Sequence, residues 1–139
     1  MIKLQKVGGL AALYQAAAYL VAIVFFLFIV DYPNVVDPVQ KVTLLIDNHV
    51  SMSLMHLAIY VVFGFCLVVL ALALYERLEA GAPALMQVAI AFGLIWAGLL
   101  IASGMIFNVG LASVVALSDQ DPAQAVSVWL AVDAVSSGL

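Results

Sequence analysis

The sequence carries little charge. Four lysine or arginine residues and eight aspartate or glutamate residues make up 9% of its 139 residues. About a quarter of the residues in a soluble domain are charged, so this composition excludes an ordinary soluble globular domain. The basic residues form no cluster along the sequence. Nucleic acid is therefore excluded as a partner.

Cysteine is almost absent as well. The single cysteine, Cys66, lies in the middle of an apolar run and cannot form a disulfide within the chain. Cysteine usage therefore gives no indication of the redox compartment. We interpret Cys66 as a small hydrophobic residue that faces lipid or a neighbouring helix.

Long uncharged runs dominate the rest of the chain, which is 68% hydrophobic with a mean hydropathy of +1.27. About 20 residues of helix cross the hydrocarbon core of a bilayer. The runs predict an all-α integral membrane bundle in a lipid bilayer, with three transmembrane helices at about 8–30, 50–75 and 84–108. We prefer a first span to a signal peptide, because the run is longer than a signal core and no small-residue cleavage site follows it.

The third uncharged run continues to residue 117, so it covers 34 residues. As one helix it would measure about 51 Å, well beyond the hydrocarbon thickness. We therefore expect it to tilt, to protrude or to break. The first candidate for a break is residues 108–110 (Asn-Val-Gly), and the second is Ser103 with Gly104.

A short amphipathic helix is predicted at about 122–137. Asp121 can cap it, Pro122 suits its first position, and Gln124 completes a capping-box pattern. Sixteen residues are too few to span, so the helix lies at the interface, re-enters the membrane or packs on the bundle. The chain ends in Ser-Ser-Gly-Leu without a polar tail, and we expect it to be a fragment of a longer protein.

The few basic residues predict an orientation. Lys3 and Lys6 precede the first span and Arg77 follows the second, whereas Lys41 lies in the loop between them. Because loops rich in lysine and arginine stay in the cytoplasm, the N-terminus is predicted to be cytoplasmic. The 31–49 loop and the C-terminal helix then lie outside, and the protein is predicted to sit in the inner (plasma) membrane of the cell.

Small residues recur at a spacing of four in two of the predicted spans. Such ladders allow helices to approach closely in lipid, either within one chain or between copies in a homo-oligomer. The first span and the third span carry one ladder each: Gly8, Ala12, Ala16; Ala89, Gly93, Ala97.

Metal-ligating side chains gather at the start of the second span. His49, Met52 and His56 project to one face of the helix, and Met55 lies at its edge. Imidazole and thioether suit copper(I), so these four residues form a candidate metal site. No cysteine joins them, and methionine is common in membrane spans. Interfacial histidines with ordinary hydrogen-bond partners are the simpler interpretation, and we predict no cofactor.

Other chemistries have less support. Haem would need a second axial ligand from another helix or another copy, because both histidines lie on one helix. A small transporter would have to oligomerise, and the three runs contain no carboxylate. For a hydrolase, Ser51, Ser53 and His56 are too close along one helix, although Asp133 could approach His49 or His56 if the last helix folds back. We expect a non-enzymatic membrane protein of unassigned role, with a redox or metal-binding subunit and a transporter as alternatives.

The arrangement resembles a family of bacterial multi-pass membrane proteins called domain of unknown function 4386. The likeness lies in residues 9–14 (Gly-Leu-Ala-Ala-Leu-Tyr), in residues 74–78 (Leu-Tyr-Glu-Arg-Leu) and in a glycine-rich third helix. The resemblance implies a bacterial membrane protein, and it brings no catalytic motif. Such proteins have more spans than three, which again implies that this chain is a fragment.

Overall fold

The computed structural model describes residues 2–139, and the side chains from Lys3 onward. Within this part of the chain all regular structure is helical, which confirms the all-α prediction. The first helix, α1 (Ile2–Val24), continues into a π-helical segment, η1 (Phe25–Ile29), and the short 3-10 helix η2 (Tyr32–Asn34) follows. The remaining elements are α2 (Pro38–Asp47), α3 (His49–His56), the π-helical η3 (Leu57–Val62), α4 (Phe63–Leu78), α5 (Pro83–Ser118) and α6 (Pro122–Gly138).

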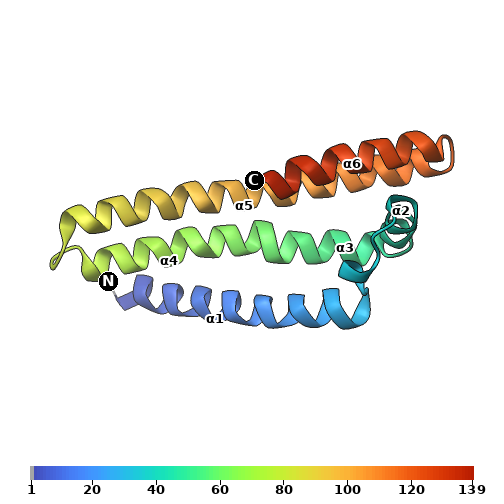
Figure 1. Cartoon of the computed structure of the whole chain (residues 1–139). Helices are drawn as coiled ribbons and strands as arrows, with labels where there is room; N and C mark the ends of the chain where they lie inside the picture. The colour runs from blue at the N-terminus through green and yellow to red at the C-terminus, as the bar shows by residue number, and fades with distance from the viewer. Residues whose placement is uncertain (1) are drawn as a thin grey trace.

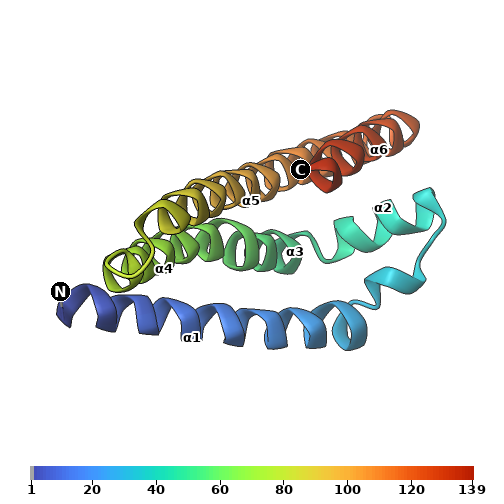
Figure 2. The same cartoon turned by 60° about the vertical axis from the view of Figure 1, so that its left-hand side comes forward.

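Three helical stretches are long and apolar enough to cross a membrane: Lys3–Ile29, His49–Leu78 and Pro83–Ser118. They run antiparallel in a row, with the continuous stretch α3–η3–α4 between α1 and α5 (Figures 1 and 2). Large apolar side chains such as Leu13, Phe28 and Phe92 remain exposed along their outer faces. A bilayer would cover these side chains, because lipid takes the place of a buried interior.

Of the three alternatives for the long third run, a break is excluded: α5 is continuous through both candidate positions, residues 108–110 and Ser103–Gly104. It is one helix of 36 residues, of which the predicted span at 84–108 is the first part. The glycines serve close packing instead of turns. Gly104 lies against Tyr60, and Gly110 lies against Val132 of α6. Because α6 covers its far end, α5 can extend beyond the end of α1 (Figure 1).

Helix α6 folds back along the far half of α5 (Figure 1). The carboxylate of Asp121 accepts a hydrogen bond from the Gln124 backbone N–H at 3.0 Å, so the predicted cap is present. Ala125 and Trp129 are 1% exposed. Of the three placements that the sequence left open, the helix therefore packs on the bundle. Its outward face also carries the apolar Leu130 and Val135, so it is less one-sided than an amphipathic helix.

The buried core lies at the end of the bundle where α2, α3, α5 and α6 meet. Asp37 caps α2 by accepting from the Gln40 N–H, and α2 turns Val42 and Leu45 inward. There they join the large buried side chains of the neighbouring helices: Phe25, Met52, Phe107, Leu111, Val114, Trp129. We call this end, which also holds the loop between the first two spans, the α2 end.

We predict that the contact between Gly104 and Tyr60 limits stability. A Cβ added at Gly104 would lie 2.5 Å from the Tyr60 Cβ, whereas one added at Gly98 would meet nothing within 4 Å. Gly104→Ala should therefore cost roughly 1–3 kcal/mol by overpacking. Gly98→Ala should be neutral or stabilise by up to about 1 kcal/mol, since alanine favours helix. Unfolding of the purified protein by a denaturing detergent measures both, and equal stability of the two variants would contradict the packing described here.

Candidate functional site

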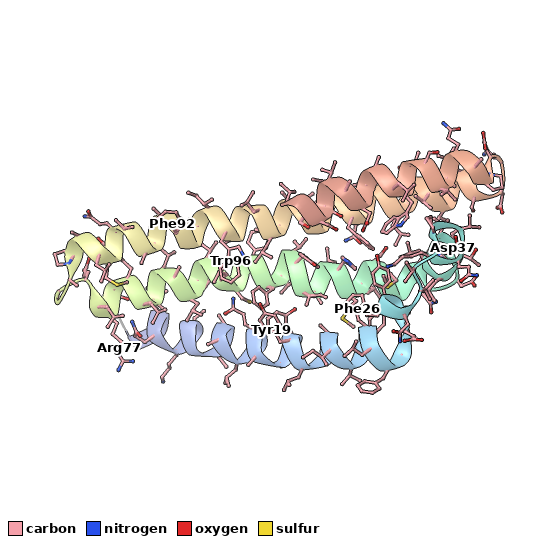
Figure 3. The ribbon with its side chains drawn as sticks, in the orientation of Figure 1. Tyr19, Phe26, Asp37, Arg77, Phe92 and Trp96 are labelled. Atoms are coloured by element: carbon pink, nitrogen blue, oxygen red, sulfur yellow. The ribbon has the colours of Figure 1, made fainter. Side chains whose placement is uncertain are left out.

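His56 lies at the centre of an aromatic cluster at the α2 end. Its ring is parallel to that of Phe107, with centroids 3.4 Å apart, and nearly parallel to that of Tyr60 at 5.2 Å. Phe26 of η1 meets the imidazole edge-on at 5.7 Å, and Figure 3 shows Phe26 between the end of α1 and the middle helix. Phe107 in turn meets Trp129 of α6 edge-on at 5.5 Å. Helices far apart in the sequence therefore fix the histidine from several sides.

A backbone hydrogen bond sets the tautomer of His56. The ring Nδ1 lies 3.0 Å from the carbonyl oxygen of Met52, one turn earlier in the helix. A carbonyl can only accept, so Nδ1 carries the hydrogen. In the neutral ring Nε2 is then the acceptor, which leaves His56 able to receive a hydrogen bond from a ligand.

A cavity of about 330 Å³ opens beside this histidine. Its walls come from η1, η2, α3, η3, α5 and α6, so it forms only when both the first loop and α6 are in place. Ten residues line it: Phe26, Tyr32, Pro33, His56, Tyr60, Ser103, Phe107, Asp133, Ser136, Ser137. Its volume lies at the lower end of the range for small-molecule sites, about 300–1,000 Å³.

Asp133 brings a carboxylate to the same cavity. From the sequence, Asp133 was expected to approach His49 or His56 only if the last helix folded back. Helix α6 does return along α5, and Asp133 and His56 line the same cavity. Burial raises the pKa of the Tyr32 hydroxyl above its usual value, and the negative charge of Asp133 and the nearby Tyr60 raise it further. The Asp133 carboxylate and the Tyr32 hydroxyl therefore interact electrostatically across the cavity that both residues line.

The cavity serines hold helices together. The Ser103 hydroxyl donates to the backbone carbonyl of Ser136 at 2.8 Å and so ties the end of α6 to α5. The Ser136 hydroxyl lies 3.4 Å from the carbonyl of Asp133, and that of Ser137 lies 3.5 Å from the Asp133 carboxylate. None of these bonds pairs a serine hydroxyl with His56, as activation of a serine nucleophile would require.

Two π-helical segments border the site. His56 is followed at once by η3, which contains Tyr60, and η1 contains Phe26. Such segments insert an extra residue into a helical turn and frequently occur at functional sites. Here one lies in the first span and the other in the second, and they supply two of the cavity's aromatic walls.

The four residues of the predicted metal site lie in different surroundings. His49 is exposed, and its Nδ1 donates to the Ile46 carbonyl at 2.8 Å. Met52 is fully buried, whereas Met55 faces α1 beside separate apolar cavities. Of the four, only His56 lines the main cavity. Nowhere in residues 2–139 do three histidine, cysteine, aspartate or glutamate side chains converge as metal ligands. Copper or haem binding stays a prediction.

Sequence reasoning missed most of the cavity wall. Phe26, Tyr32 and Phe107 were not singled out, and Ser103 was considered only as part of a helix break, because aromatic and small polar residues are unremarkable in an apolar run. A weak signal did exist on the third span, where Ser103 and Phe107 are four residues apart and so share one face. That face also carries Gly104 and Gly110 close by, which pack against Tyr60 and α6.

Comparison with known proteins adds no assignment. No family model matches the sequence, and no curated protein or solved structure was found to match it. The resemblance to domain of unknown function 4386 therefore stays a prediction, and the site has to be interpreted from its own geometry.

We predict that Tyr32 keeps its proton to a higher pH than an ordinary tyrosine. Because the folded pKa is raised, this group contributes stability below its unfolded pKa of about 10, and that stability is lost as the pH rises toward the folded pKa. Tyr32→Phe should lose less stability than the wild type above pH ~10. Alkaline detergent unfolding tests this, and Asp133→Asn should also reduce the loss.

Tyr75→Phe is the matched control, because Tyr75 lies on α4 at the opposite end of the bundle. The ultraviolet absorbance of tyrosinate provides a second measurement. If the absorbance change lost in Tyr32→Phe occurred near pH ~10, the value for an unperturbed tyrosine, the buried environment assigned to Tyr32 would be wrong.

Proposed function

We propose that this protein is a non-enzymatic multi-pass membrane protein that binds a small molecule in the cavity around His56. The observation that carries the proposal is the convergence of one acid, one imidazole acceptor and four other aromatic rings on a cavity of about 330 Å³. Small-molecule sites are typically apolar clefts with a few polar groups placed to orient a ligand. This cavity has that composition, and elements from all three spans build it.

Binding is better supported than hydrolysis. A serine or water nucleophile would need a base aimed at it. The only imidazole in the cavity donates its Nδ1 hydrogen to the Met52 backbone and not to Asp133, so Asp133 does not orient it as in a catalytic triad. Ser103 directs its hydroxyl at a backbone carbonyl. These bonds suit a rigid binding site.

We further propose that the α2 end faces outward from the inner membrane of a bacterial cell. Lys3, Lys6 and Arg77 lie together at the opposite end, where Figure 3 shows Arg77 beside the start of α1. Lys41 lies at the α2 end. The positive-inside rule then leaves the cavity accessible from outside the cell.

We also propose that the protein self-associates, through fewer of the small residues than the two ladders in the sequence indicated. Gly8 is buried against Ala73, and Ala97 is fully buried beside Gly64, so these ladder residues pack within the chain. Ala16 and Ala89 are exposed and remain available to lipid or to a second copy.

Ligand binding can be tested with a cavity-filling variant. Ser137 is exposed and lines the cavity, so Ser137→Phe should fill the cavity from its rim with little effect on the fold. Ser127→Phe is the matched control, because Ser127 is an exposed serine on the same helix outside the cavity lining. We expect small molecules from a mixed panel of neutral, cationic and anionic compounds to raise the unfolding temperature of the wild type and of Ser127→Phe, and not of Ser137→Phe. A panel that shifts none of the three proteins would refute the proposal.

The orientation is tested by thiol labelling in intact cells. With Cys66→Ala as background, Ser137→Cys should react with a membrane-impermeant maleimide, and Gly81→Cys in the turn between α4 and α5 should react only after lysis. If Gly81→Cys were labelled in intact cells and Ser137→Cys were not, the protein would have the opposite orientation in the membrane. Because the fold does not depend on orientation, that result would leave the cavity itself unaffected.

A further inference from the structure

We propose that the ligand of the His56 cavity is a small quaternary ammonium compound, an inference that rests on the binding function proposed above. The walls offer one carboxylate and several aromatic rings. This combination recognises a positive charge that carries no N–H groups.

The charge of the cavity favours a cation. Among its ten lining residues the only acid is Asp133, and no lysine or arginine is present. An anionic ligand would lie beside an uncompensated carboxylate, which costs free energy in a site of low dielectric constant. One basic side chain lies outside the cavity on α2: Lys41, whose Nζ is 4.0 Å from the centroid of the Tyr32 ring. Its position shows that this ring already attracts a cation to one face.

The aromatic walls meet at steep angles. The rings of Phe26 and Tyr32 are inclined by 69°, and those of Phe26 and His56 by 86°. Phe107 and Tyr60 lie nearly parallel to His56 and stack on it, so these three rings form one layered wall. A compact cation between such walls can lie over more than one ring face, and cation–π attraction strengthens when water is excluded.

Polarity separates a quaternary ammonium from a protonated primary amine. A primary ammonium group brings three N–H donors, each of which needs an acceptor when it is buried. The hydroxyl groups of Ser103, Ser136 and Ser137 already donate their hydrogens within the protein. A primary ammonium group is also strongly hydrated and would lose that hydration among aromatic walls, so a cation without N–H donors fits better.

The surroundings of Asp133 supply a further reason for a cationic ligand. Its carboxylate lines a cavity that also has four aromatic rings of phenylalanine and tyrosine in its wall. A carboxylate beside apolar walls is costly unless it is paired or hydrated. A bound quaternary ammonium would provide the opposite charge without the desolvation cost of a strongly hydrated metal ion.

The experiment compares choline with 3,3-dimethylbutan-1-ol, in which carbon replaces the charged nitrogen. The experiment uses the full chain in detergent with the substitution Trp96→Phe, which leaves Trp129 as the only source of tryptophan fluorescence. Trp129 contacts the cavity residue Phe107. We expect choline to quench or shift the Trp129 emission at concentrations about tenfold or more below those of its neutral analogue. Asp133→Asn should weaken choline binding about tenfold or more and leave the analogue unchanged.

Asp119→Asn is the matched control, because it removes the same charge from the exposed turn between α5 and α6. Equal affinity for the two probes, unchanged choline affinity in a folded Asp133→Asn protein, or no response to choline would each overturn this inference. The proposed binding function is judged separately by the mixed panel with Ser137→Phe. If neutral compounds bind in the cavity and choline does not, the proposal of a cationic ligand is refuted and the proposed binding function stands.

Discussion

The return of α6 along α5 is the contact on which the site depends. Trp129 and Ala125 are buried between the two helices, and the hydroxyl of Ser103 fastens the end of α6 to α5. Without this contact, Phe107 would lose its edge-on partner and Asp133 would not reach the cavity. The same contact explains why α5 can exceed the bilayer thickness, since its far end is covered by protein.

Several polar side chains at the cavity donate to nearby backbone carbonyls, and this limits what they can do. His56 donates to the backbone of its own helix, and the serines of α5 and α6 donate to backbone carbonyls. Unsatisfied donors cost several kcal/mol in lipid, roughly 2–7 for an amide or hydroxyl. Once these bonds are made, the cavity retains mainly acceptors and aromatic faces, a composition suited to holding a ligand and ill suited to proton transfer through serine.

Much of the fold was predictable from the sequence because run length and charge placement act locally. The three apolar helices and the Asp121 cap follow from such rules, and the structure confirms them. The sequence left a break in α5 open as one alternative, because glycine was interpreted as a possible helix breaker, whereas Gly104 and Gly110 provide room for neighbouring helices. The cavity could not be predicted from the sequence for a different reason. Tertiary packing alone brings Phe26, Phe107 and Asp133 together, and the pattern of apolar residues along the chain does not indicate which helices pack against each other.

The location of the core suggests why binding and stability are linked in this chain. The largest fully buried side chains gather at the α2 end, directly behind the cavity wall, while the opposite half of the row exposes apolar surface to lipid. Trp129 contacts Phe107, which stacks on His56, so a ligand on one side of this wall meets residues whose other side forms the core. A ligand that orders the cavity would therefore stabilise the packing of α6 against α5, because binding to the folded state alone adds to its stability.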